Sequence, residues 1–157
     1  MNKTKSVIKI LCPGLYISEK LIFFYRISKF LYNINFQIAS LFIRTRNLRK
    51  YNCSISQRCE IGKNPYMPHP IAIIIGDGAI LGNNVHIYHN VTIGAKDEKR
   101  ICYPTIHDNV IIYANATIIG DISVGEGAII GAHSLVLDDV EPHSIVCGVP
   151  ARKIGSC

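Results

Sequence analysis

Large aliphatic residues recur at every sixth position through the central part of this chain. One series covers positions 75 to 93 and a second covers positions 106 to 136: Ile75, Leu81, Ile87, Ile93, then Ile106, Ile112, Ile118, Val124, Ile130 and Val136. A period of six matches neither the repeat of an α-helix, about 3.6 residues, nor the two-residue alternation of a half-buried strand. It is typical of a solenoid whose coils each have three short flat faces, with one aliphatic side chain per face pointing inward.

Small and turn-forming residues occupy the positions between these aliphatic anchors. A small apolar or hydroxyl residue lies two positions before most anchors, and Gly, Asn or Asp follows many of them, as in segments 75–78 and 124–127. These residues tolerate the left-handed backbone conformation that a tight corner requires. An antiparallel sandwich would instead show two-residue alternation with turns about every 8–12 residues. The pattern therefore predicts a mainly β protein built as a parallel β-helix.

Two interruptions break the six-residue register. The step from Met67 to Ile75 is eight residues, which predicts a bulge of two extra residues at His69. The step from Ile93 to Ile106 is thirteen, and the intervening segment 95–103 is the most charged stretch of the repeat region. We expect this segment to project from the solenoid as a loop. Such interruptions are common places for functional residues, since the repeat itself serves packing.

The first third of the chain differs in composition from the rest. Residues 1–51 contain ten Lys or Arg, one acidic residue and all five Phe, whereas residues 52–157 contain seven Lys or Arg and ten acidic residues. We expect a basic amphipathic helical arm over 1–51 and a β-helix with a C-terminal tail over 52–157. The basic charge is confined to the arm and the repeat region holds no nucleic-acid-binding motif, so nucleic acid is not an expected partner.

Apolar residues recur at helical spacing within the arm. The spacing predicts a short helix over 3–11, a helix over 19–33 capped by Ser18, and a helix over 36–48. No uncharged run reaches the ~18 residues that a membrane span needs. A basic, aromatic helix pair is suited to lie on an anionic membrane surface. Its apolar face is also suited to pack on the solenoid or on a neighbouring subunit, and the sequence leaves both interpretations open.

The cysteines and the N-terminus predict a cytoplasmic location. The six cysteines form no Cys-x-x-Cys pair, as expected for reduced thiols. The first apolar run is broken at Cys12-Pro13-Gly14 and has no small-residue cleavage site, so no cleavable signal peptide is expected. If the arm binds lipid, the protein would be peripheral at the inner face of the cell membrane.

Residues 52–155 resemble the hexapeptide-repeat acyltransferases, and most of all their serine acetyltransferase-like branch. The resemblance rests on four segments, which are 69–77, 90–94, 103–106 and 148–152. It implies a left-handed β-helix, acetyl-CoA as donor, an acceptor hydroxyl, no metal, and a homotrimer with active sites between subunits. The family's catalytic histidine falls on His69.

Three other positions depart from the family pattern. Tyr103 replaces the second active-site histidine, Pro68 replaces the aspartate that precedes the catalytic histidine, and Ser54 replaces the early aspartate of the first repeat. Short relatives with a His-Pro pair, a Tyr-Pro pair and a basic helical arm resemble O-acetyltransferases of surface-polysaccharide synthesis. We therefore expect an acetyl-CoA-dependent O-acetyltransferase that acts on a sugar hydroxyl. The alternative is a serine O-acetyltransferase of cysteine biosynthesis.

Acyl transfer from a thioester to a hydroxyl needs a base and donors for the developing oxyanion. His69, held in a bulge between two prolines, is the candidate general base, because a histidine pKa near 6.5 suits proton transfer at neutral pH. Gly94 and Ala95, at the start of the projecting loop, are candidates to present backbone N–H groups to the thioester oxygen. A simple turn is the alternative role for these two.

The remaining candidates concern the cofactor and the acceptor. Ala114 and Ala132, 18 residues apart, would let the pantetheine arm pack along successive coils, unless they only pack a corner. Arg152 and Lys153 are candidates for the cofactor phosphates, or else a solvated pair. Tyr103 and His89 are candidate acceptor-binding residues.

Two other classes of protein deserve comparison. A non-catalytic trimeric scaffold would not need His69 in its bulge. A γ-class carbonic anhydrase also uses a left-handed β-helix, but it needs histidines placed to bind zinc, and no His-x-x-x-His or Cys-His spacing occurs. We therefore expect no metal.

Overall fold

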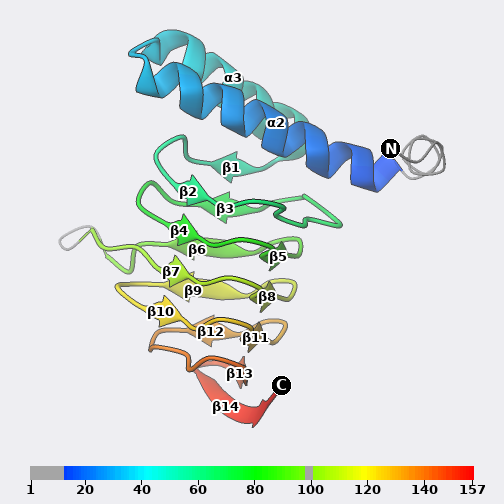
Figure 1. The fold of residues 1–157 in the computed structure, drawn as a ribbon, viewed down its shortest axis with the longest axis vertical. Helices are drawn as coiled ribbons and strands as arrows, with labels where there is room; N and C mark the ends of the chain where they lie inside the picture. Colours follow the sequence, from blue (N-terminus) through cyan, green and yellow to red (C-terminus); the bar gives the residue numbers. More distant parts are fainter. Residues whose placement is uncertain (1–12, 98–100) are drawn as a thin grey trace.

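The computed structural model describes residues 13–97 and 101–157, so the helix predicted over 3–11 lies outside the described residues. Two helices come first, α2 (Pro13–Asn33) and α3 (Gln37–Tyr51). Short strands follow (Figure 1): β1 Ser54–Ile55, β2 Glu60–Ile61, β3 Ile74–Ile75, β4 Ile80–Leu81, β5 His86–Ile87, β6 Thr92–Gly94, β7 Thr105–Ile106, β8 Ile111–Ile112, β9 Thr117–Ile119, β10 Ser123–Val124, β11 Ile129–Ile130, β12 Leu135–Val136, β13 Ser144–Gly148 and β14 Ala151–Ser156.

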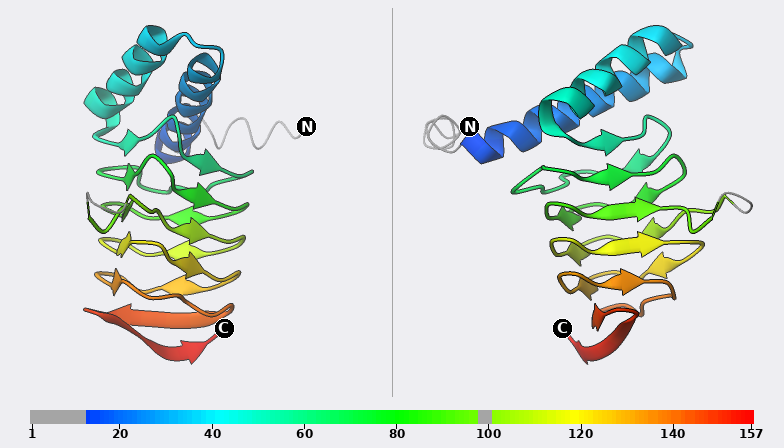
Figure 2. Two further views of the ribbon diagram at one scale, coloured as in Figure 1. Left: turned by 90° about the vertical axis from the view of Figure 1, so that its left-hand side faces the viewer. Right: turned by 180° about the vertical axis from the view of Figure 1, so that it is seen from behind.

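The strands stack into the three faces of a prism. One sheet has the order β1-β3-β6-β9-β12, the second β10-β7-β4-β2 and the third β14-β13-β11-β8-β5. Every pairing between coils is parallel, and equivalent anchors lie in register, such as Ile75 with Ile93 and Ile93 with Ile118. The predicted left-handed parallel β-helix is confirmed, because each six-residue repeat forms one face of a coil (Figure 2).

The aliphatic anchors fill the interior of the prism. All ten anchors of the two series are at most 2% exposed, and the small residues before them, such as Ala79, Val110 and Ala116, are fully buried. At one edge of the prism, Asn90 donates to Asn115, whose amide in turn contacts the His133 ring. All three have positive φ, which Asn and His tolerate at a corner better than most side chains do.

The last strand departs from the solenoid pattern. β14 pairs antiparallel with β13 and closes the third sheet at the C-terminal end of the stack. The turn between these strands places Gly148 at φ 104, a conformation that side chains rarely adopt.

The helical arm covers the opposite end of the prism (Figures 1 and 2). Leu21, Ile22 and Tyr25 on α2 are buried in the same core as the first coil. The Tyr25 hydroxyl donates to the Cys59 carbonyl at 2.8 Å, and the Lys29 ammonium contacts both that carbonyl and the Glu60 carboxylate. One face of the arm therefore packs on the solenoid, as one of the two interpretations requires.

Two expectations about the arm are wrong in detail. Ser18 does not cap a helix, because α2 already begins at Pro13 and buries Ser18 within it; a proline is tolerated in the first helical turn, where its missing N–H has no partner to lose. The second helix extends three residues beyond Leu48. Asn52 then ends it at φ 53 and donates its N–H to the Leu48 carbonyl. Among the described helices, none is long and apolar enough to span a membrane.

Candidate active site

The predicted bulge at His69 is present. Tyr66 pairs with His86 of the next coil. The Ile71 carbonyl accepts a hydrogen bond from the Asn90 N–H. One coil later, the His89 carbonyl accepts the equivalent hydrogen bond from the Asn115 N–H. Ile71 is thus equivalent to His89, but it lies five residues after Tyr66, whereas His89 lies three after His86. The two extra residues therefore lie within the segment Pro68-His69-Pro70.

The His69 side chain is exposed at the edge between the third sheet and the first. Its backbone carbonyl accepts from the Ile71 N–H at 2.8 Å, which closes a tight turn over Pro70. The His69 ring lies 6.3 Å from the His89 ring, centre to centre, so the structure brings these two predicted site residues together. Among the described residues, none forms a hydrogen bond with a His69 ring nitrogen. Its imidazole is therefore available to a substrate.

A hollow of about 420 Å³ lies beside His69, between the bulge and the arm. Pro68, His69 and Ile71 line one side of it. Arg49 and Lys50, at the C-terminal end of α3, line the other. The sequence analysis did not assign these two to the site. The signal was present as a basic run immediately before the first repeat, but only the folded arm shows that this run turns back over the bulge.

Tyr103 lies at a different edge of the prism. It follows the projecting loop between β6 and β7, at the edge between the first sheet and the second. In Figure 1 this loop leaves the stack on the left, whereas the segment between β2 and β3, which contains the bulge, leaves it on the right. Within one chain the structure therefore does not bring Tyr103 and His69 together.

The predicted cofactor residues are divided between these two edges. Gly94 ends β6 and Ala95 follows it, on the edge of Tyr103; nothing lies within 4 Å of a Cβ placed on Gly94. Ala114 and Ala132 lie on the edge of His69, one and two coils beyond His89, and the Ala114 carbonyl accepts from His133. Both are small, but Tyr113 precedes Ala114 and His133 follows Ala132 on the same edge.

Arg152 and Lys153 lie on β14, at the opposite end of the stack from His69. Arg152 pairs with Asp138 at 3.6 Å and Lys153 with Glu141 at 2.6 Å. The Lys153 ammonium lowers the pKa of the Glu141 carboxyl through its hydrogen bond and its charge. Both cations thus have acidic partners already, and a cofactor phosphate would have to compete with them.

No group of three or more His, Cys, Asp or Glu side chains able to hold a metal ion occurs within 13–97 and 101–157. The described cysteines are all free thiols. Burial raises the pKa of the Cys59 thiol to about 11, so this thiol is inert at neutral pH.

Comparisons with known proteins identify the class to which this solenoid, with a histidine in a coil bulge, belongs. Residues 103–138 match the family described as bacterial transferase hexapeptide (six repeats). Residues 53–89 match the hexapeptide repeat of succinyl-transferase.

Several serine acetyltransferases are similar to this chain. The one from Buchnera aphidicola subsp. Schizaphis graminum is 37% identical over 132 residues, 83% of this chain and 51% of the relative. The serine acetyltransferase from Escherichia coli K12 is 36% identical over 132 residues, which are 83% of this chain and 48% of the relative. The solved structure of soybean serine acetyltransferase complexed with serine has a TM-score of 0.85 and 34% identity over 88% of this chain and 58% of that one.

The chain belongs to the hexapeptide-repeat acyltransferases, in their serine acetyltransferase-like branch. It spans about half the length of the curated relatives it matches.

Proposed function

We propose that this protein is an acetyl-CoA-dependent O-acetyltransferase with His69 as its general base. The observation that carries the proposal is His69 itself, exposed in a two-residue bulge, with no hydrogen bond to its ring nitrogens from the described residues, in a chain of this family. In a direct transfer, the imidazole takes the proton of the acceptor hydroxyl as its oxygen attacks the thioester carbon. The carbon–sulfur bond then breaks, and the imidazolium returns the proton to the leaving thiolate.

Serine is the first candidate for the acceptor. All the similar curated proteins named above are serine acetyltransferases, and one similar solved structure is complexed with serine. These similarities favour the alternative of the sequence analysis over its preferred acceptor, a sugar. The expectation of a sugar rests on the departures from the family pattern at Pro68, Ser54 and Tyr103.

A sugar hydroxyl remains the second candidate, on a specific observation. The hollow beside His69 has Pro68 where the family has an aspartate, and none of its lining residues is acidic. An amino acid acceptor carries an ammonium group, and lining residues without a carboxylate do not neutralise its charge. A sugar without an amine has no such requirement.

We infer that the active protein is a homotrimer. His69, His89, Ala114 and Ala132 lie on one edge of the prism, and Gly94, Ala95 and Tyr103 on another. A neighbouring subunit would bring the second edge against the first, so that acetyl-CoA is held between chains. Sedimentation should then give about three times the 17.4 kDa chain mass. A monomer at micromolar concentration would refute this arrangement.

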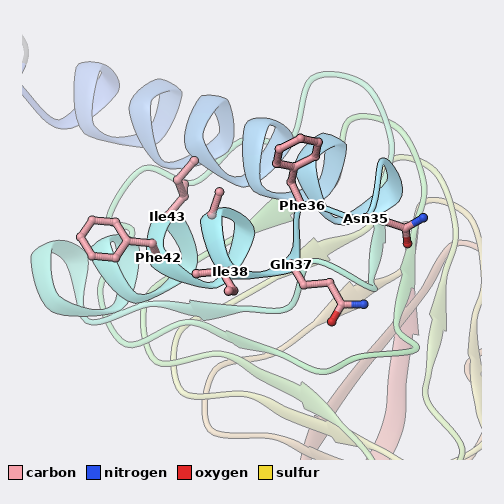
Figure 3. A pocket seen from close by; sticks show the side chains of 7 residues that line it. Asn35, Phe36, Gln37, Ile38, Phe42 and Ile43 are labelled. Atoms are coloured by element: carbon pink, nitrogen blue, oxygen red, sulfur yellow. The ribbon is translucent and has the colours of Figure 1, made fainter.

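The uncovered face of the arm supports a further part of the proposal, contact with an anionic membrane surface in the cytoplasm. Ile38 and Phe42 on α3 are 88% and 79% exposed. They line a hollow of about 630 Å³ together with Phe36 (Figure 3). Arg44 and Arg46 follow on the same helix, and such a combination of apolar and basic side chains suits an anionic interface.

The central experiment supplies acetyl-CoA with serine or with a panel of sugars and follows release of the free CoA thiol. Acceptor-dependent release that His69→Ala abolishes is the expected result. Acceptor-dependent release that is unchanged in His69→Ala would overturn the assignment of the base. No acceptor-dependent release with any hydroxyl compound would count against the function itself.

A further inference from the structure

We propose that Arg49 and Lys50 make the hollow beside His69 a binding site for an anionic group on the acceptor. This inference rests on the proposed function, since it assumes that the acceptor of the acetyl group binds in the hollow. It names the acceptor class as a hydroxyl compound that also bears a carboxylate or a phosphate. Serine and acidic sugars both belong to that class, and neutral sugars do not.

The geometry places both cations across the hollow from the general base. Arg49, Lys50 and His69 line the same hollow of about 420 Å³. Arg49 has no hydrogen bond or ion pair with another described residue, and the Lys50 ammonium lies 5.5 Å from the centre of the Tyr51 ring. A guanidinium without an internal partner can form two parallel hydrogen bonds to a carboxylate or phosphate.

The charge around the hollow is not neutralised by the chain. No acidic residue occurs between Glu19 and Glu60, which covers most of α2, all of α3 and the first strand. None of the residues lining the hollow is acidic, and His69 can only add positive charge. An anion entering this space would meet two cations and no acidic side chain among the lining residues.

The position of the cations assigns them to the acceptor and not to the donor. Ala114 and Ala132, the residues expected beside the pantetheine arm, lie on successive coils beyond His89, toward the C-terminal end of the stack. Arg49 and Lys50 lie on the other side of His69, at the end covered by the arm. The two substrates would therefore approach the imidazole from opposite directions, as a transfer between them requires.

The test compares acceptors that differ only in charge, using the full-length protein. L-Serine is paired with L-serinamide, and glucuronate with glucuronamide, with CoA release giving kcat/KM and calorimetry giving binding. Charge-assisted hydrogen bonds predict a preference of roughly tenfold to a hundredfold for the anionic member of at least one pair. The two pairs distinguish an amino acid from an acidic sugar.

Two arginine variants identify the cause of any preference. Arg49→Gln should reduce the preference to near one, mainly by raising KM for the anionic acceptor. Arg44→Gln removes the same charge from the same helix, but Arg44 does not line the hollow, so it should leave the preference unchanged.

Each outcome decides the matter. Equal use of charged and neutral acceptors, or a preference that survives Arg49→Gln, overturns the anionic site while leaving acetyl transfer intact. Arg49-dependent binding of serine or glucuronate without any transfer supports the site and counts against the proposed function. Neither binding nor transfer overturns both.

Discussion

The ring of Tyr103 lies against the backbone of Gly76 in the coil before it. A Cβ added to Gly76 would stand 2.5 Å from Cε1 of that ring, and one added to Gly78 would stand 2.5 Å from Cδ2. Tyr103 is thus packed on the corner between β3 and β4, half-buried against the core. The tyrosine that replaces the family's second histidine therefore anchors the end of the projecting loop to the preceding coil.

This contact predicts that Gly76→Ala displaces the Tyr103 ring. The methyl group cannot be accommodated without moving the ring outward, and overpacking of this kind costs about 1–3 kcal/mol in the free energy of unfolding. Denaturant unfolding measures the change. The matched control is Gly94→Ala, where nothing lies within 4 Å of the new methyl group and little change in stability is expected. Equal stability of the two variants would contradict the contact.

The six-residue period was sufficient to predict the solenoid. Anchors such as Ile87 and Ile118 are fully buried, so the need to place one aliphatic side chain inside each face of a coil determines their spacing. The first residues of α2 were not predictable in the same way. Serine is a residue type that often caps helices, and this favoured a helix start at Ser18. Packing of α2 on the first coil determines where the helix begins, and this long-range contact cannot be read from the neighbouring sequence.

The candidate site was predictable only in part. The bulge at His69 was predictable from the number of residues between the aliphatic anchors, because an insertion into a regular repeat lengthens that step. The position of Arg49 and Lys50 beside His69 was not predictable, because it depends on the direction in which α3 returns to the solenoid. The division of the predicted residues between two edges was also not apparent, since positions such as Tyr103 and His69 appear equivalent until strands are assigned to faces.

We predict that His69→Ala lowers turnover with the natural acceptor by about a hundredfold to ten-thousandfold, the usual contribution of a general base. The His69 side chain is exposed, so the melting temperature should change little. His107→Ala is the control, because His107 lies on a different edge and contacts Ser123. Steady-state kinetics at saturating acetyl-CoA give the comparison. Near-normal turnover of His69→Ala would transfer the assignment to His89.

A second stability prediction concerns pH. The Asp108 carboxylate accepts from both the side-chain amide and the backbone N–H of Asn83, and these hydrogen bonds lower the pKa of Asp108. Because its pKa is lower in the folded state than in the unfolded state, the ionised group stabilises the fold above the unfolded pKa. That contribution is lost as the pH falls through the folded pKa.

Replacing this carboxylate should therefore weaken the dependence of stability on acid. Asp108→Asn is expected to lower the melting temperature at neutral pH and to flatten its decline below about pH 4. Thermal unfolding across that range measures both effects. Profiles of the variant and the native protein that run parallel at all pH values would show that Asp108 makes no such contribution.

The last prediction concerns the uncovered face of the arm. If α3 contacts an anionic membrane, vesicles containing phosphatidylserine should bind the protein and vesicles of phosphatidylcholine alone should not. Each basic residue near the surface contributes about 1 kcal/mol, so binding should weaken as salt is added. Phe42→Glu places a negative charge in the centre of the exposed apolar face and should abolish binding. Ile154→Glu is the matched control, because Ile154 is 66% exposed but lies on β14 at the far end of the stack. Binding that both variants retain, or that native protein lacks at low salt, would show that no lipid covers this face. A change in sedimentation with Phe42→Glu alone would then identify a second copy of the chain as its partner.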